Sequence, residues 1–168
     1  KEAPCPHFEL CGGCKWQQLS YDEQLRQKEC NVYDVMQRIG KVDSAEFLPI
    51  IGAESVYEYR NKLEFTFSNK RWLSEEEINS NEQIDDRDGV GFHRPGAFDK
   101  VIDIHKCLLQ ADPSNEIRQR VRELAKDYAL PFYDIRQNKG VLRNLVIRTS
   151  TLGQVMVILV VKKRVSEV

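Results

Sequence analysis

The sequence predicts an α+β fold with a largely antiparallel sheet of about five strands, two main helices and a cysteine-rich N-terminal loop. Three observations predict it. Alternating or continuous apolar residues indicate strands over residues 59–68, 89–94, 98–105, 141–149 and 154–161. Short turns join most of these segments, which favours antiparallel pairing of neighbours. Two other segments carry helix start and stop signals.

The first helix is expected directly after Ser20, because Ser20 and Glu23 have the spacing of a capping box. Gly40 is placed to end this helix. The apolar residues between these two ends fall near one helical face, as in an amphipathic helix. They are Leu25, Val32, Met36 and Ile39.

The first strand has a clear alternation, with Leu63, Phe65 and Phe67 on one face, which is typical of a half-buried strand. The acidic stretch 74–88 indicates a solvated loop between this strand and the next. Pro95-Gly96 predicts the turn between the second and third strands.

The second helix is expected to start at Asp112-Pro113, with proline in the first helical position, and to stop before Pro131. Residues 150–153 predict a hairpin between the last two strands. The final strand, from Val155 to Val161, is apolar throughout, which predicts that both of its faces are covered. The apolar stripe expected on the second helix is Ile117, Val121, Leu124 and Tyr128.

The composition limits the classes of function. The 168 residues suffice for one domain with a hydrophobic core, and no apolar run approaches the roughly 20 residues of a membrane helix. The net charge is −1, so any contact with nucleic acid requires a local basic patch. Five cysteines and no secretion signal favour a cytoplasmic protein with reduced thiols. Both ends are expected to continue into a longer protein.

The cysteines indicate a metal site. Cys5, Cys11 and Cys14 lie within ten residues, and three thiolates on one loop need a fourth ligand to complete a tetrahedral set. Cys107 is the better candidate for that ligand, because it follows a strand in a polar segment. Cys30 lies in the predicted first helix, where it can pack as a small apolar residue.

Two glycines and one histidine lie beside these thiols. Gly12 and Gly13 are expected to allow positive φ angles and to offer amide donors to sulfur. His7 is a possible alternative ligand, although an ordinary loop histidine explains it better. The spacing alone leaves zinc and iron–sulfur equally compatible, with unliganded thiols as a third alternative.

Three motifs carry a resemblance to a known family. The first is Cys5-Pro6-His7-Phe8, Cys11-Gly12-Gly13-Cys14 and Trp16-Gln17-Gln18-Leu19-Ser20-Tyr21. The second is Tyr59-Arg60-Asn61-Lys62 before the alternating strand. The third is Gly91-Phe92-His93-Arg94-Pro95-Gly96, then Val101-Ile102-Asp103-Ile104 and Cys107. Together they resemble the middle domain of RNA uracil-5 methyltransferases, from residue 4 to about residue 161.

The resemblance implies a [4Fe-4S] cluster held by Cys5, Cys11, Cys14 and Cys107. Residues 1–19 would form the cluster-binding loop, and residues 20–168 the rest of the same central domain. In this family an S-adenosylmethionine-dependent domain transfers the methyl group, and an OB-like domain often precedes the cluster. Neither domain is found in the chain, so no catalytic residue and no S-adenosylmethionine-binding residue is expected here.

The resemblance also implies that the domain positions structured RNA, with ribosomal RNA expected rather than transfer RNA. Base flipping is costly, and contacts from such a domain can offset part of that cost. The residues suited to phosphate pairing or base stacking are Tyr59, Arg60, Lys62, Phe92, His93 and Arg94. For Tyr59 and Phe92 the alternative is packing in the core, and for Arg60 it is a solvated strand face.

Two alternatives come from other classes of protein. A small iron–sulfur electron carrier would undergo reversible one-electron reduction without loss of fold. A zinc-stabilised interaction module would contain zinc and no sulfide. Metal content separates the zinc module from the other two hypotheses.

Overall fold

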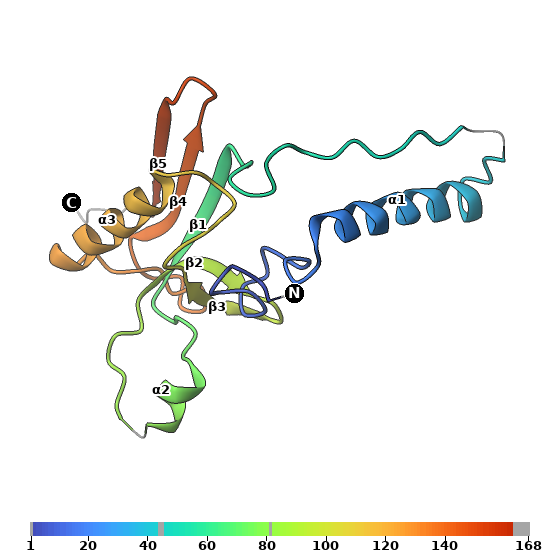
Figure 1. The fold of residues 1–168 in the computed structure, drawn as a ribbon. Coiled ribbons are helices and arrows are strands. Elements are labelled where there is room, and N and C mark those ends of the chain that lie inside the picture. The colour runs from blue at the N-terminus through green and yellow to red at the C-terminus, as the bar shows by residue number, and fades with distance from the viewer. Residues whose placement is uncertain (1, 44–45, 81, 163–168) are drawn as a thin grey trace.

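The computed structural model describes residues 2–43, 46–80 and 82–162. Its centre is one five-stranded sheet with the order β3-β2-β1-β4-β5, in which all neighbours are antiparallel (Figure 1). The predicted α+β class is therefore confirmed. The strands are β1 (Lys62–Ser68), β2 (Gly89–Arg94), β3 (Ala97–Asp103), β4 (Leu142–Thr149) and β5 (Val155–Val161).

The core forms where the predicted alternation places it. Leu63, Phe65 and Phe67 of the central strand β1 are all buried. Phe67 packs edge-on against Phe132, with 5.1 Å between ring centroids. Helix α3 (Ser114–Asp127) contributes the buried Ala125 to the same cluster. Burial of these large apolar side chains is the main source of stability for the sheet.

Helix α3 matches its predicted signals only in part. The helix begins one residue after Pro113. At its C-terminal end, the Leu130 amide donates to the Ala125 carbonyl, and Pro131 follows directly. Ile117 and Val121 pack against the core as expected. The prediction for Tyr128 was wrong, because this side chain is 73% exposed beyond the last turn of the helix.

The acidic stretch is not wholly a loop. It contains the short helix α2 (Glu75–Asn79), which begins at a complete capping box of Ser74 and Glu77. The Glu77 carboxylate also lies 2.6 Å from the guanidinium of Arg71. Further along, Asp86 forms an ion pair with Lys126 of α3. These local and long-range pairs order part of a segment that composition alone assigns to solvent.

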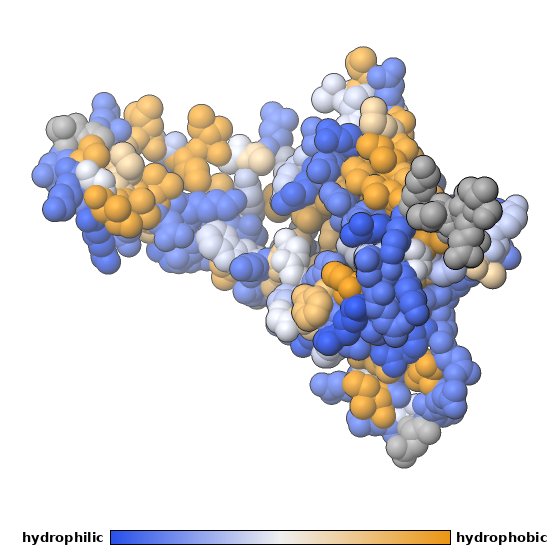
Figure 2. All heavy atoms as spheres, turned by 180° about the vertical axis from the view of Figure 1, so that it is seen from behind, coloured by the Kyte–Doolittle hydropathy of each residue, from blue (hydrophilic) through white to orange (hydrophobic). Residues whose placement is uncertain are grey.

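Helix α1 (Tyr21–Arg38) starts at the predicted cap but packs against no core. The Ser20 hydroxyl accepts from the Glu23 amide at 3.3 Å, while the Glu23 carboxylate turns to Arg26 instead of closing the capping box. No side chain of α1 is buried, and its apolar Val32 is 58% exposed. The helix projects from the sheet as an arm, on which apolar side chains gather (Figures 1 and 2).

An extended segment returns along this arm. The Ile50 amide donates to Glu29 at 3.0 Å, and the Ala53 amide donates to the Tyr21 hydroxyl at 2.6 Å. Tyr33 and Phe47 meet edge-on, with 5.0 Å between their centroids. Helix α1 and the extended segment are therefore held together by contacts with each other.

Strand β5 contradicts the prediction that both of its faces are covered. It pairs only with β4 at the edge of the sheet, and all seven of its residues are exposed. The hairpin that joins it to β4 is as predicted, with the Ser150 amide donating to the Gln154 carbonyl. Within the described ranges, no helix combines the length and apolarity needed to cross a membrane.

Candidate metal centre and its surroundings

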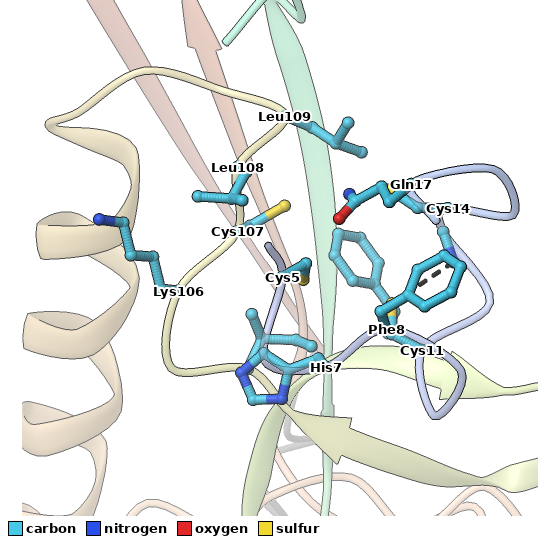
Figure 3. Close-up of a pocket in the computed structure, with 13 residues that line it drawn as sticks. Cys5, His7, Phe8, Cys11, Cys14, Gln17, Lys106, Cys107, Leu108 and Leu109 are labelled. Atoms are coloured by element: carbon cyan, nitrogen blue, oxygen red, sulfur yellow. Dashed lines mark hydrogen bonds between the residues drawn. The ribbon is translucent and has the colours of Figure 1, made fainter. Parts of the chain in front are cut away.

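The four cysteines singled out by the sequence line one pocket (Figure 3). Cys5, Cys11 and Cys14 come from the N-terminal loop, and Cys107 comes from the segment between β3 and α3. The space between the lining atoms, including the mouth of the pocket, is about 350 Å³. Cys30 lies apart from them, exposed on α1. The fold thus brings together thiols from two distant parts of the chain.

The N-terminal loop is wound by tight backbone contacts. The Phe8 amide donates to the Cys5 carbonyl at 3.0 Å, and the Cys11 amide donates to the His7 carbonyl at 2.9 Å. The Gly13 amide donates to Cys11 Sγ at 3.4 Å, as the sequence suggested for this glycine pair. The expected positive φ falls instead on Glu9, at 71°. Gly12 is restricted by space, because a Cβ there would lie 3.0 Å from Pro95.

His7 ties the loop to the segment that carries Cys107. Its Nε2 accepts from the His105 amide at 3.0 Å, and the two imidazole rings stack with centroids 5.7 Å apart. Burial lowers the pKa of His7, and the neighbouring His105 and Arg118 lower it further. This ring nitrogen is therefore occupied by a backbone donor, which is the contact of a structural histidine.

Asn115 holds Cys107 through both of its backbone polar groups. The Cys107 amide donates to Asn115 Oδ1 at 2.8 Å, and Asn115 Nδ2 donates to the Cys107 carbonyl at 3.2 Å. Both residues are buried. Asn115 stands in the first turn of α3, so the start of this helix fixes the backbone of the fourth cysteine.

The thiols lie in an environment that disfavours free thiolates. Burial raises the pKa of Cys11 to about 11 and also raises the pKa values of Cys14 and Cys107. Without metal, these groups are protonated at neutral pH, and a bound metal would displace their protons. Among the described residues, no three His, Cys, Asp or Glu side chains are spaced to hold a single metal ion.

Four of the residues predicted to contact RNA lie in residues 59–62 and in strand β2. Tyr59 is 58% exposed, and the guanidinium of Arg60 lies 6.0 Å from its ring centroid. Lys62 is exposed at the start of β1, 3.8 Å from the carboxylate of Glu64. His93 is exposed on β2. These members of the predicted set thus come from two segments of the chain.

Two other members of that set are engaged with protein side chains. The half-buried Phe92 packs against the core Phe65, with 5.0 Å between centroids. The guanidinium of Arg94 lies 4.1 Å from the ring centroid of Trp72. For Phe92, core packing is the alternative that the contacts favour.

An open groove beside the thiol pocket was not predicted. It runs between the N-terminal loop, the base of α1 and residues 53–59, and about 1430 Å³ of space, including its mouth, lies between its lining atoms. Its aromatic and basic lining residues are Lys15, Trp16, Tyr21, Lys28, Tyr57 and Tyr59, and its described lining includes no Asp or Glu. Residues 12–28, residues 53–59 and Leu109 form it, and these are far apart in the sequence, so no single motif indicates it.

No family model matches the chain. It is 52% identical over 158 residues to an uncharacterized RNA methyltransferase of Bacteroides thetaiotaomicron, a match of 94% of this chain and 35% of the relative. A second uncharacterized RNA methyltransferase, from Porphyromonas gingivalis, is 49% identical over 93% of this chain and 35% of its own length. The chain thus spans about a third of the curated relatives it matches.

A solved structure has the same fold. The Pyrococcus abyssi tRNA (uracil-54, C5)-methyltransferase, in complex with S-adenosyl-L-homocysteine, matches with a TM-score of 0.66 and 22% identity, over 92% of this chain and 32% of that one. Over nearly its whole length, the chain is similar in sequence to one segment of these RNA methyltransferases. These comparisons support the family predicted from its motifs, that of the RNA uracil-5 methyltransferases.

Proposed function

We propose that this chain is the cluster-binding, RNA-positioning segment of an S-adenosylmethionine-dependent RNA uracil-5 methyltransferase. Cys5, Cys11, Cys14 and Cys107 hold a [4Fe-4S] cluster in this proposal. The observation that carries it is the convergence of these four thiols on one pocket, from an N-terminal loop and from the segment between β3 and α3. Thiolates are the ligands that iron–sulfur clusters and zinc both use.

The family motif favours a cluster over a single zinc ion. The four cysteines that line the pocket suit either group, since zinc and iron–sulfur clusters both bind thiolates. The Gly13 amide on Cys11 Sγ is the kind of donor that tunes such clusters.

A cluster bound here would have a structural consequence. It would tie the N-terminal loop to the Cys107 segment, beside the backbone contact between His7 and His105. The free energy of metal binding would then contribute to folding. This role requires no change of oxidation state.

The methyl transfer itself belongs to other parts of the parent protein. The relatives are RNA methyltransferases about three times as long as this chain, and the structural neighbour carries S-adenosyl-L-homocysteine. No S-adenosylmethionine-binding or catalytic residue is assigned to the 168 residues. The chain alone is expected to transfer no methyl group to a uracil-containing RNA.

The open groove provides a surface for RNA. Unpaired bases stack on aromatic rings, which Trp16, Tyr57 and Tyr59 offer here, and Lys15 and Lys28 can pair with phosphates. A lining without described carboxylates avoids repulsion of the RNA backbone. Structured RNA with unpaired loop bases is therefore the proposed partner. Ribosomal over transfer RNA stays a prediction, since the structural neighbour acts on tRNA.

Metal analysis tests the proposal. The chain is purified without oxygen, and iron, sulfide and zinc are measured per chain with the visible spectrum. About four irons with equal sulfide and broad visible absorption are expected. One zinc in a colourless protein would support the zinc-stabilised module instead. Reversible reduction of an iron-loaded chain that binds no RNA would support the electron carrier.

A further inference from the structure

Arg118 is a buried cation without a carboxylate partner. The residue is 1% exposed, although it lies in the middle of α3. Its guanidinium donates to the His105 carbonyl at 2.7 Å and to Asn115 Oδ1 at 3.0 Å, and it lies 5.1 Å from the ring centroid of Phe65. All three contacts are neutral. None of the ion pairs between described residues includes Arg118.

A buried charge with only neutral partners is unfavourable unless a counter-charge lies nearby. Burial lowers the pKa of Arg118, and the negative charge of a Cys107 thiolate is the largest influence in the opposite direction. Among carboxylates, Asp103 has the largest favourable influence on the Arg118 charge, but it is already paired with Arg122 at 2.8 Å. The thiol pocket is therefore the place where an anionic group would compensate Arg118.

Asn115 couples Arg118 to Cys107. The same Asn115 Oδ1 accepts from the Cys107 amide and from the Arg118 guanidinium, at 2.8 Å and 3.0 Å. Asn115 itself is held by Asp112, whose carboxylate accepts from the Asn115 amide at 3.0 Å. A shift of the cation would thus move the backbone of the fourth cysteine.

We propose that Arg118 is the buried counter-charge for metal-bound thiolates in the cysteine pocket, and that Asn115 positions Arg118 and Cys107 relative to each other. This inference rests on the proposed function, because it requires a metal group on the thiols. Four thiolates around iron or zinc carry net negative charge, which a nearby guanidinium stabilises. Arg118 is a positioning and charge-balancing residue, and it contacts no reacting atom.

The sign of its effect on the potential follows from charge. Reduction adds an electron to an already negative site, and a buried cation favours the more negative state. Loss of the Arg118 charge is therefore expected to shift the midpoint potential of the cluster to more negative values. It is also expected to speed the loss of metal to a chelator, by about tenfold to a hundredfold.

The test compares Arg118→Gln, Arg118→Lys and Asn115→Asp in the anaerobically loaded chain. Asn115→Asp places a carboxylate against the guanidinium, so it neutralises the cation without removing it, and it also removes the donor to the Cys107 carbonyl. Arg118→Gln and Asn115→Asp should both lower the potential and speed metal loss. Arg118→Lys should retain most of the potential of the unaltered chain.

The matched control is Arg120→Gln. Arg120 lies on the same helix, but its side chain is 64% exposed and paired with Glu123, so neither readout should change. Faster metal loss in both Arg118 variants, with an unchanged potential, would reduce Arg118 to a packing role and overturn the proposal. Unchanged metal loss in Arg118→Gln would also overturn it.

Failure of the proposed function gives a different result. A chain that binds no metal before any substitution refutes the metal site itself. A chain that binds zinc has no midpoint potential to measure. The rate of zinc loss then tests whether Arg118 is the counter-charge. In that case faster loss in Arg118→Gln, rescued by Arg118→Lys, supports the counter-charge, and equal rates contradict it.

Discussion

The N-terminal loop and helix α1 are neighbours in the sequence, yet they are stabilised in opposite ways. The loop has no regular structure, but His7 attaches it to the segment near residue 105, and its cysteines share a pocket with Cys107. Helix α1 has a good cap and regular hydrogen bonds, but none of its side chains is buried. Local signals can thus specify a helix that makes few long-range contacts, while long-range contacts fix a loop that has few local signals.

The largest expected effect separates the sheet core from the arm. Phe65→Ala should destabilise the chain by about 3–5 kcal/mol, because the ring is fully buried between Phe92 and Arg118. Ile39→Ala, at a residue that is 77% exposed at the end of α1, should cost less than about 0.5 kcal/mol. Urea unfolding followed by circular dichroism measures both. Equal losses would show that the arm belongs to the cooperative core.

A second effect concerns the groove between the two regions. Tyr59→Ala should weaken binding of a single-stranded RNA by about 1–3 kcal/mol, the usual contribution of a base stacked on an aromatic ring. Phe98→Ala is the control, since Phe98 is also an exposed aromatic residue beside an arginine but does not line the groove. Fluorescence anisotropy with labelled RNA measures both. Equal weakening by the two variants would contradict RNA binding in the groove.

The cap of the arm gives a smaller effect. Ser20→Ala removes the acceptor of the Glu23 amide and should destabilise α1 by about 1 kcal/mol. Hydrogen exchange followed by mass spectrometry should show faster exchange in residues 21–38 and no change in β1. Faster exchange in β1 as well would mean that the arm and the sheet unfold together.

The stability of the metal-free chain should depend on pH through the partly buried Cys11 in the loop, but not through the exposed Cys30 in the arm. Burial raises the pKa of Cys11 in the folded chain to about 11, from an ordinary value of 9.0. Between these values the folded state binds more protons than the unfolded state, so stability falls as the pH rises from about 9 to 11. Cys11→Ser should flatten this slope, and Cys30→Ser should not. Thermal unfolding of the chelated chain at several pH values measures this dependence. An equal slope of stability against pH in both variants would show that burial of Cys11 does not cause it.

The sequence predicted features that depend on local pattern. The alternation in β1, the cap at Ser20 and the turn at Pro95-Gly96 each depend on a few adjacent residues, and the fold agrees with all three. Helix α2 was missed although its capping box at Ser74 and Glu77 was readable, because the acidic composition favoured a loop.

Other features depend on contacts that periodicity does not specify. The apolar run in β5 is compatible with a covered strand or with an exposed edge, and neighbours in space decide between the two. Arg118 has the sequence appearance of a solvated helix charge, yet it is buried beside the thiols. The four cysteines line one pocket, and their density together with the family motif supplied the long-range information that grouped them.

The most direct test of the central claim is the iron content of Cys107→Ser compared with Cys30→Ser. Cys107 is the only thiol of the pocket outside the N-terminal loop, and Cys30 is exposed on α1. After anaerobic purification, Cys30→Ser should retain about four irons with equal sulfide, and Cys107→Ser should lose most of both. Equal iron and sulfide in the two variants would contradict a cluster that joins the N-terminal loop to the segment between β3 and α3.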